Sequence, residues 1–355
     1  MSDSGKRRLS RRRLLGGAAA GTAALPILHE LIPHRGVHGQ DAAAQEHAAH
    51  RRVAGHNSAA HRGSGHIGAV GKVNPRVNGF DPVAMLRDFD EGTVKREGGR
   101  TVREWQLVAE DIEIEVAPGV KYAAWAYNRR VPGPTLRAKE GERLRVRFIN
   151  GSRHPHTIHF HGIHRDVMDG IPGVGAGNIE PGQSTTYEFD AEPFGLHLYH
   201  CHSSPLAEHI AKGLYGAFVI DPKKGRPKAD ELVMVMNGFD TNFDRTNEIY
   251  AVNTVAFEYM HRPVKVKRDQ LVRIYLVNAL EFDLLNSFHV HANFFDYYPT
   301  GTKLEPRDFT DTVVQGQGER GILEMRFPYT GKYMFHAHVS EFAELGWMGF
   351  FEVED

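Results

Sequence analysis

From residue 105 onward, short apolar runs alternate with turn-forming residues along the chain. The runs at 120–127, 144–149, 185–189 and 216–220 contain β-branched and aromatic residues, and Pro and Gly separate them, as at 131–134. Runs of this length between turn signals predict β-strands. Several such strands in succession favour an all-β sandwich.

The order of these segments returns about 130 residues later. A repeat of this length indicates two domains of one architecture, formed by duplication. Residues 221–228, rich in Lys, Pro and Gly, lie between the repeats and are the predicted linker. We therefore expect β-sandwich domains at 80–220 and 229–355. The matching segments are 142–150 and 269–278, 159–161 and 289–291, and 195–202 and 331–338.

The first 79 residues have a different composition. Residues 1–40 carry arginines at 7–13 and then a short run of Gly, Ala and Leu, a pattern that resembles a twin-arginine export signal and predicts a periplasmic or extracellular protein. A disordered basic tail is the alternative. Residues 41–79 are rich in His, Ala, Gly and Arg and lack a hydrophobic period, which predicts a disordered tail.

Charge and composition narrow the function classes. The 43 basic and 44 acidic residues leave a net charge of -1, which argues against bulk attraction to nucleic acid. No apolar run reaches the roughly 20 residues that a membrane-spanning helix needs, so we expect no membrane span. The single cysteine excludes an intrachain disulfide framework. The unusual feature is the 22 histidines.

Four His-x-His pairs occupy equivalent places in the two repeats. Residues i and i+2 of a strand point to the same face, so each pair offers two imidazoles side by side. A single pair arises easily by chance, but four equivalent pairs argue for a metal. Imidazoles without carboxylates favour Cu, Zn or Fe over Mg or Ca. The pairs are His159 and His161, His200 and His202, His289 and His291, and His336 and His338.

The only cysteine separates copper from zinc. Cys201 lies between two histidines of one pair, with His156 upstream and His209 downstream. A soft thiolate with two imidazoles and a weak or absent axial ligand is the blue-copper donor set. The alternative is a buried structural thiol, a common fate of a lone cysteine.

These motifs resemble the two-domain, laccase-like multicopper oxidases over roughly residues 100–355. Residues 156–162 are similar to the family's His-x-x-His-x-His-Gly motif, and His200-Cys201-His202 followed by His209 is similar to its His-Cys-His…His element. The resemblance implies two cupredoxin-like Greek-key β-sandwich domains. It also implies one-electron oxidation of small reductants, with reduction of O2 to water.

The resemblance further implies about four copper ions per chain, distributed over three kinds of site. The type 1 copper would be held by His156, Cys201 and His209, with Leu214 at the axial position, where a side chain without a ligand atom raises the reduction potential. The type 2 ligands would be His159 and His289, and the type 3 ligands would be His161, His200, His202, His291, His336 and His338.

The second repeat lacks a type 1 site. Asn286 stands where the first repeat has His156, and Ala337 stands where it has Cys201. The resemblance implies a homotrimer in which each trinuclear cluster lies between domain 1 of one subunit and domain 2 of the next. The partners would be O2 and a small reducing substrate, with phenols as the expected class.

Reduction of O2 needs protons, and two acidic residues are candidate carriers. Asp169 lies in a segment similar to the family's Asp-Gly-x-Pro sequence, although Asp before Gly is also a common turn residue. Glu341 follows His338 by three residues, and a helix-cap or surface role is the alternative for it.

Two rival functions stay open. A copper-containing nitrite reductase shares the two-cupredoxin plan, and the spacing from Cys201 to His209 is close to that of the nitrite reductases. That enzyme, however, needs an Asp where this chain has His159 and lacks a second histidine where it has His202. The other rival is a non-catalytic periplasmic copper-binding protein.

Overall fold

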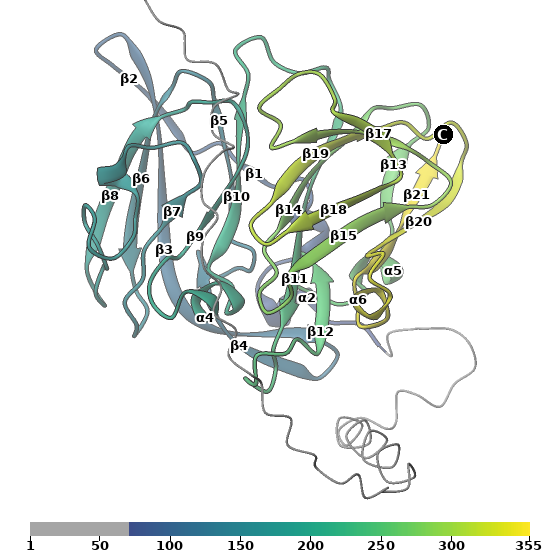
Figure 1. Cartoon of the computed structure of the whole chain (residues 1–355), viewed down its shortest axis with the longest axis horizontal. Helices are drawn as coiled ribbons and strands as arrows, with labels where there is room; N and C mark the ends of the chain where they lie inside the picture. The colour runs from purple at the N-terminus through teal and green to yellow at the C-terminus, as the bar shows by residue number, and fades with distance from the viewer. Residues whose placement is uncertain (1–70) are drawn as a thin grey trace, which may run out of the picture. The chain divides into compact units, whose positions relative to one another are not determined.

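The computed structural model describes residues 71–355, which form an all-β structure, as predicted (Figure 1). The predicted export signal at 1–40 and most of the predicted tail lie outside the described residues. Within 71–355, no helix is long and apolar enough to cross a membrane. The helices are α2 (Pro75–Asn78), α3 (Pro82–Met85), the 3-10 helix η1 (Asp166–Met168), α4 (Leu206–Ala211), α5 (Glu258–His261) and α6 (Ser340–Glu344).

The first sandwich consists of two mixed sheets whose apolar faces enclose Phe148, Phe160 and Tyr199. The predicted strands at 120–127, 144–149, 185–189 and 216–220 all fall within strands of these two sheets. One sheet has the order β1 (Phe89–Asp90), β5 (Thr135–Lys139), β10 (Tyr215–Asp221), β9 (Gly195–His200) and β7 (His159–Phe160). The other has the order β2 (Thr93–Glu97), β3 (Arg100–Ala117), β6 (Arg143–Asn150) and β8 (Ser184–Asp190), with β4 (Val120–Tyr127) paired to β3.

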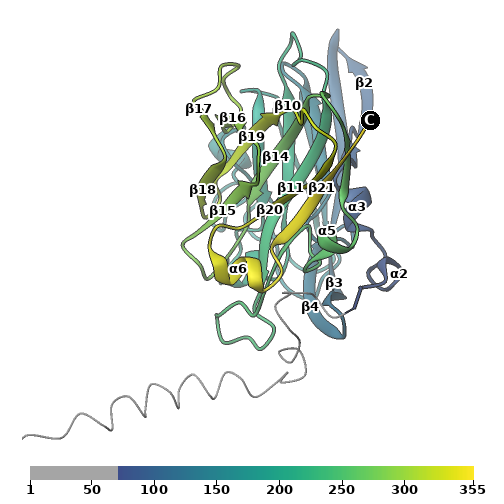
Figure 2. The ribbon, with the colours of Figure 1, turned by 90° about the vertical axis from the view of Figure 1, so that its right-hand side faces the viewer.

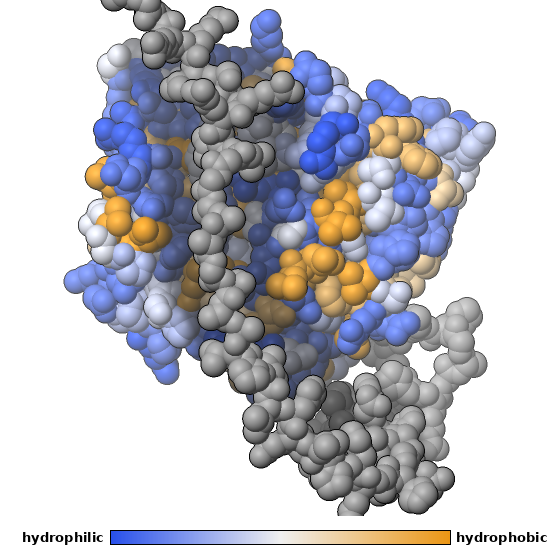
Figure 3. Space-filling model, in the orientation of Figure 1, coloured by the Kyte–Doolittle hydropathy of each residue, from blue (hydrophilic) through white to orange (hydrophobic). Residues whose placement is uncertain are grey.

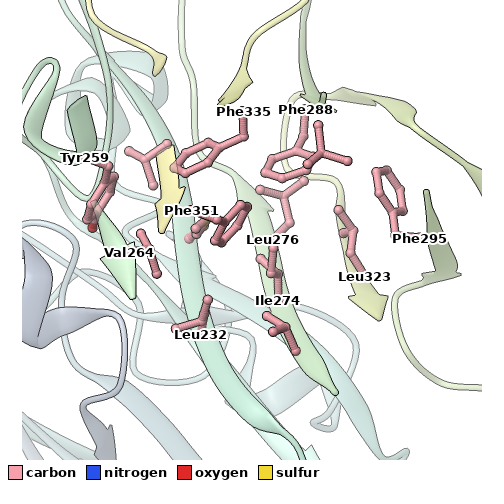
Figure 4. Close-up of a cluster of buried hydrophobic side chains, with 14 of the residues drawn as sticks. Leu232, Tyr259, Val264, Ile274, Leu276, Phe288, Phe295, Leu323, Phe335 and Phe351 are labelled. Carbon is pink, nitrogen blue, oxygen red and sulfur yellow. The ribbon is translucent and has the colours of Figure 1, made fainter. Parts of the chain in front are cut away.

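The second sandwich repeats this plan. Its core is rich in aromatic and branched side chains, among them Leu276, Phe288 and Phe335 (Figure 4). One sheet has the order β12 (Ile249–Val252), β11 (Asp230–Phe239), β14 (Val272–Asn278), β19 (Arg320–Met325), β16 (Phe295–Pro299) and β17 (Asp308–Thr310). The other has the order β13 (Val264–Lys267), β21 (Met348–Glu354), β20 (Gly331–His336), β15 (Leu285–Val290) and β18 (Thr312–Gly316).

The two sandwiches share a third apolar cluster. It joins Tyr122 and Ala217 of the first sandwich to Val235 and Tyr275 of the second. At its edge the guanidinium of Arg137 pairs with carboxylates on both sides, Asp221 at 2.7 Å and Glu231 at 2.7 Å. This shared core makes the described chain one compact unit.

The predicted boundaries at 79 and 80 need correction. Residues 71–79, expected in the disordered tail, contain α2, whose last residue Asn78 is buried and exchanges two hydrogen bonds with the backbone of Glu115, at 2.9 and 2.7 Å. Such a helix has no readable period because it spans four residues; Asn74 as N-cap and Pro75 at its start are the only local signals.

The segment after residue 80 packs on the second sandwich, although we expected it in domain 1. Leu86 is fully buried in the core of the second sandwich, and the hydroxyl of Tyr259 donates to the carbonyl of Pro82 at 2.9 Å. Helix α3 lies beside α5 in Figure 2. The reason is apolar complementarity, which sequence position does not reveal.

Candidate metal centre

The first candidate site joins three segments at one end of the first sandwich. Cys201 follows β9, His209 lies in α4, and His156 precedes β7. The Sγ of Cys201 lies 3.2 Å from Nδ1 of His209 and 3.8 Å from Nδ1 of His156, and the two Nδ1 atoms lie 3.1 Å apart. The structure thus brings together one thiol and two imidazole nitrogens, the predicted type 1 donor set.

Burial sets the charge state of these three candidate ligands. It lowers the pKa of His156 to about 3 and that of His209 to about 4, because an imidazolium loses its hydration there. Both rings are therefore neutral at physiological pH and keep a lone pair for a metal. Burial also raises the pKa of the Cys201 thiol, so a bound cation is what favours the thiolate. These residues fit copper.

Leu214 lies fully buried in the same apolar cluster as Cys201. Its carbonyl accepts a hydrogen bond from the backbone N–H of Cys201 at 2.9 Å, which keeps the two residues adjacent. The leucine side chain offers no ligand atom to a metal held at this site. Trp125 covers the site from β4, with ring centroids 5.2 Å from His156 and 4.7 Å from His209.

A second histidine group lies next to the first, in the same sandwich. His159, His161 and His200 present ring nitrogens within 4.8 Å of one another. The ring of His202 lies 5.5 Å from that of His159. The Nδ1 of His200 donates to the carbonyl of Cys201 at 2.8 Å, so its Nε2 carries a lone pair, and this Nε2 lies 2.9 Å from Nε2 of His161.

The second sandwich contains a matching group made of His289, His291 and His336. The Nε2 atoms of His291 and His336 again lie 2.9 Å apart, and the ring of His338 lies 5.3 Å from that of His289. In each sandwich the backbone N–H of the last histidine donates to a buried hydroxyl, at 2.9 Å for His202 and 2.8 Å for His338. The eight predicted ligands therefore form two equivalent groups of four.

Each histidine group belongs to one sandwich. Among the described residues, no group of three or more close ligand atoms combines histidines of both sandwiches. The group of the first sandwich faces a cavity of about 250 Å³ whose far side is lined by Leu280, Glu281 and Gly318 of the second. In the group of the second sandwich, His291 is exposed.

Glu281, which carries no signal in the sequence, also lines this cavity. Burial raises the pKa of its carboxyl to about 7. No motif surrounds it, and only the packing of the two sandwiches places it in a cavity with His159 and His161.

The two predicted proton carriers lie in different surroundings. A carboxylate oxygen of Asp169 lies 2.8 Å from Nδ1 of His159, and the Asp169 carbonyl accepts from the same nitrogen at 2.9 Å. This contact directs Nε2 of His159 toward the other histidines. His164, also unforeseen, lies 3.5 Å from the same carboxylate. Glu341 lies in the first turn of α6 and is exposed.

The place that corresponds to the type 1 site is filled in the second sandwich. Asn286 and Ala337 are fully buried and stand at the predicted positions. The N–H of Ala337 donates to the carbonyl of Trp347 at 3.2 Å, as that of Cys201 does to Leu214. Trp347 is thus the structural equivalent of Leu214. Its buried indole packs on Phe288 and Phe335 in the apolar core.

Comparisons with known proteins agree with this geometry. Two family models, each described as multicopper oxidase, match residues 109–225 and 226–355. A solved multicopper oxidase is 63% identical, covers 80% of this chain and 100% of its own, and superposes with a TM-score of 0.79. A blue copper oxidase from Nitrosomonas europaea is 28% identical over 71% of this chain and 86% of its own, with a TM-score of 0.64.

Nitrite reductases are also similar. A copper-containing nitrite reductase from Neisseria meningitidis is 33% identical over 242 residues, which is 62% of this chain and 61% of that protein. The match thus spans less than two thirds of this relative's length.

The two family models together match most of the chain. The chain therefore belongs to the multicopper oxidase family, whose members are copper oxidoreductases with cupredoxin-like domains.

Proposed function

We propose that this protein is a laccase-like oxidase that couples one-electron oxidation of small reductants, phenols above all, to reduction of O2 to water. The observation that carries the proposal is the full set of eight histidines, arranged as two equivalent groups beside a Cys-His-His site. Copper bound there would accept single electrons at the type 1 site and deliver four of them to O2 at a trinuclear cluster.

The chain itself provides the electron path. Cys201 is bonded through the backbone to both His200 and His202, so a thiolate ligand of one site and imidazole ligands of the next are covalent neighbours. Burial keeps His161 and His200 neutral, with pKa values of about 3 and about 4, so both remain available as ligands.

We propose Asp169 as the residue that carries protons to the cluster, because its carboxylate contacts His159 directly. Glu341 was the other candidate. In the described part of the chain, its side chain makes no hydrogen bond to a histidine.

A second copy of the chain would complete the cluster, and we propose the homotrimer on this ground. Each histidine group supplies half of the ligands, and the group of the second sandwich is open to solvent at His291. Large apolar side chains are also exposed on or next to β15, β17 and β18: Leu284, Leu285, Phe294, Phe309 and Val314. Figure 3 shows apolar patches on the second sandwich.

The structural features favour oxygen over nitrite. His159 stands where a nitrite reductase would need an aspartate. Its Nδ1 donates a hydrogen bond to the backbone carbonyl of Asp169. His202 adds a fourth imidazole to the group, with its ring centroid 5.9 Å from that of His200.

We also propose export through a twin-arginine signal at residues 1–40, which lie outside the described part of the chain.

Copper quantitation with oxygen uptake on a phenol tests the function. The oxidase should hold about four copper ions per chain, a nitrite reductase about two, and a carrier a variable and labile amount. Cys201→Ser should abolish the strong visible absorption of a blue site while the other copper ions stay bound, because Cys201 is the only thiolate. About two copper ions per chain with nitrite turnover would contradict the proposal.

A further inference from the structure

A chain of hydrogen bonds runs from a surface carboxylate to the type 1 site. Nε2 of His156 lies 2.9 Å from Oγ of Ser152, and that hydroxyl lies 2.6 Å from a carboxylate oxygen of Asp111. His156 is fully buried and Ser152 is 4% exposed, so little water competes for these two contacts. The other carboxylate oxygen of Asp111 accepts from the backbone N–H of Arg153 at 3.2 Å, which fixes the orientation of the carboxylate.

The direction of both bonds follows from the hydrogens available. A carboxylate only accepts hydrogen bonds, so the single hydrogen of the Ser152 hydroxyl goes to Asp111. The hydroxyl oxygen must then accept from His156, which places the imidazole hydrogen on Nε2. Nδ1, the atom that faces Cys201 and His209, is therefore left with its lone pair.

The position of Asp111 at the site has a structural cause. Asp111 continues the face of β3 that carries the buried residues Leu107 and Ala109, since alternate residues of a strand share a face. It is directly paired with Trp125 of β4, whose ring packs on His156 and His209. Strand β3 thus supplies a fixed negative charge next to one ligand of the site.

We propose that Asp111 is a positioning residue for the type 1 site, acting through Ser152 to hold His156 in its metal-binding tautomer and to lower the reduction potential. The inference rests on the proposed function, which places copper at His156. A carboxylate hydrogen-bonded through a hydroxyl makes the imidazole a stronger donor, and its charge favours the more positive Cu(II) over Cu(I). Both effects lower the potential and oppose the effect of Leu214.

The test is a redox titration of the copper-loaded protein, followed by the visible absorption of the blue site. Asp111→Asn keeps an oxygen that can accept from Ser152 but removes the charge. We expect the ratio of Cu(II) to Cu(I) affinity to fall about tenfold, which raises the potential by about 59 mV for one electron. The copper content should stay the same.

Glu110→Gln is the matched control. Glu110 is the neighbouring residue of β3, faces the other side of the strand and pairs with Arg129 at 3.1 Å. It undergoes the same loss of charge, yet it should leave the potential unchanged. Equal shifts in the Asp111→Asn and Glu110→Gln proteins would overturn the proposal, because only the net charge would then matter.

Ser152→Ala keeps the proposal testable if Asp111→Asn does not fold. This substitution removes the hydroxyl that links Asp111 to His156. We expect a higher reduction potential together with an altered Cu(II) EPR spectrum, since Nε2 of His156 loses its hydrogen-bond acceptor. An unchanged potential and spectrum would overturn the inference. A wild-type protein without blue absorption would instead refute the type 1 site itself, so the two failures are distinct.

Discussion

The Nε2 atoms of His161 and His200 lie 2.9 Å apart, and one of them carries a lone pair because the Nδ1 of His200 donates to a carbonyl. Two nitrogens so close are stabilised by a cation that both can bind. The same distance recurs in the second sandwich, between His291 and His336. Each half of the proposed cluster is therefore preformed in a single chain.

This arrangement predicts complementation between damaged subunits. In the proposed trimer, a chain with His200→Ala and a chain with His338→Ala should each be inactive alone, because every cluster would lack a ligand. Mixed trimers would contain some interfaces with both lesions and some with none, so part of the oxygen uptake should return on mixing.

The control for that experiment pairs His200→Ala with His202→Ala. Both lesions then affect the first sandwich, no interface is intact, and activity should stay absent. Recovery in this control, or no recovery in the first mixture, would mean that the cluster is not shared between subunits.

A second prediction concerns the axial position. Leu214→Met should lower the reduction potential of the type 1 site by tens of millivolts, on the order typical of adding a weak axial thioether ligand. A redox titration measures the shift. Leu214→Ile adds no ligand atom and should lower the potential less; equal potentials in all three proteins would show that Leu214 is not axial.

Glu281 predicts a pH dependence of stability. Its pKa of about 7 in the folded chain exceeds its ordinary value of 4.5, so the folded state binds this proton more tightly than the unfolded state does. The contribution of Glu281 to stability is complete below about pH 4.5, falls as the pH rises, and is lost above about pH 7.

Glu281→Gln removes this contribution. The variant should gain stability relative to the wild type as the pH is raised from about 4.5 to about 7, with a constant difference above that. Urea denaturation at several pH values measures this. A difference that does not vary with pH would contradict the raised pKa.

The core of the second sandwich supports a fourth prediction. Leu276 is fully buried between the two sheets, so Leu276→Ala should destabilise the chain by about 2–5 kcal/mol through lost burial and a cavity. Val94→Ala on β2, where the side chain is 53% exposed, should change the free energy of unfolding by less than about 0.5 kcal/mol. Chemical denaturation of the two variants compares them.

Much of the fold, and the candidate ligand residues that the structure groups together, could be predicted from the sequence. The strands could be predicted because apolar runs of strand length stand between turn residues, and β4 spans the residues that the pattern indicates. The histidine pairs could be recognised because residues i and i+2 share a face of a strand. Cys201 could be proposed as the thiolate ligand because the sequence contains no other cysteine.

What the sequence determined by itself is the chemistry of the candidate ligands and their local pairing, since both depend on residue type and on neighbours along the chain. Only the tertiary structure decided that Asp111 and Ser152 reach His156, that Glu281 faces the first histidine group, and that Leu86 packs in the second sandwich. Ser152 lies only four positions before His156, but Asp111 lies 41 positions before Ser152, and the contacts of Glu281 and Leu86 join residues still farther apart. The contact between Asp111 and Ser152 arises from the pairing of β3 with β6, and the other two arise from packing between the sandwiches or onto them; neither leaves a periodic signal in the sequence.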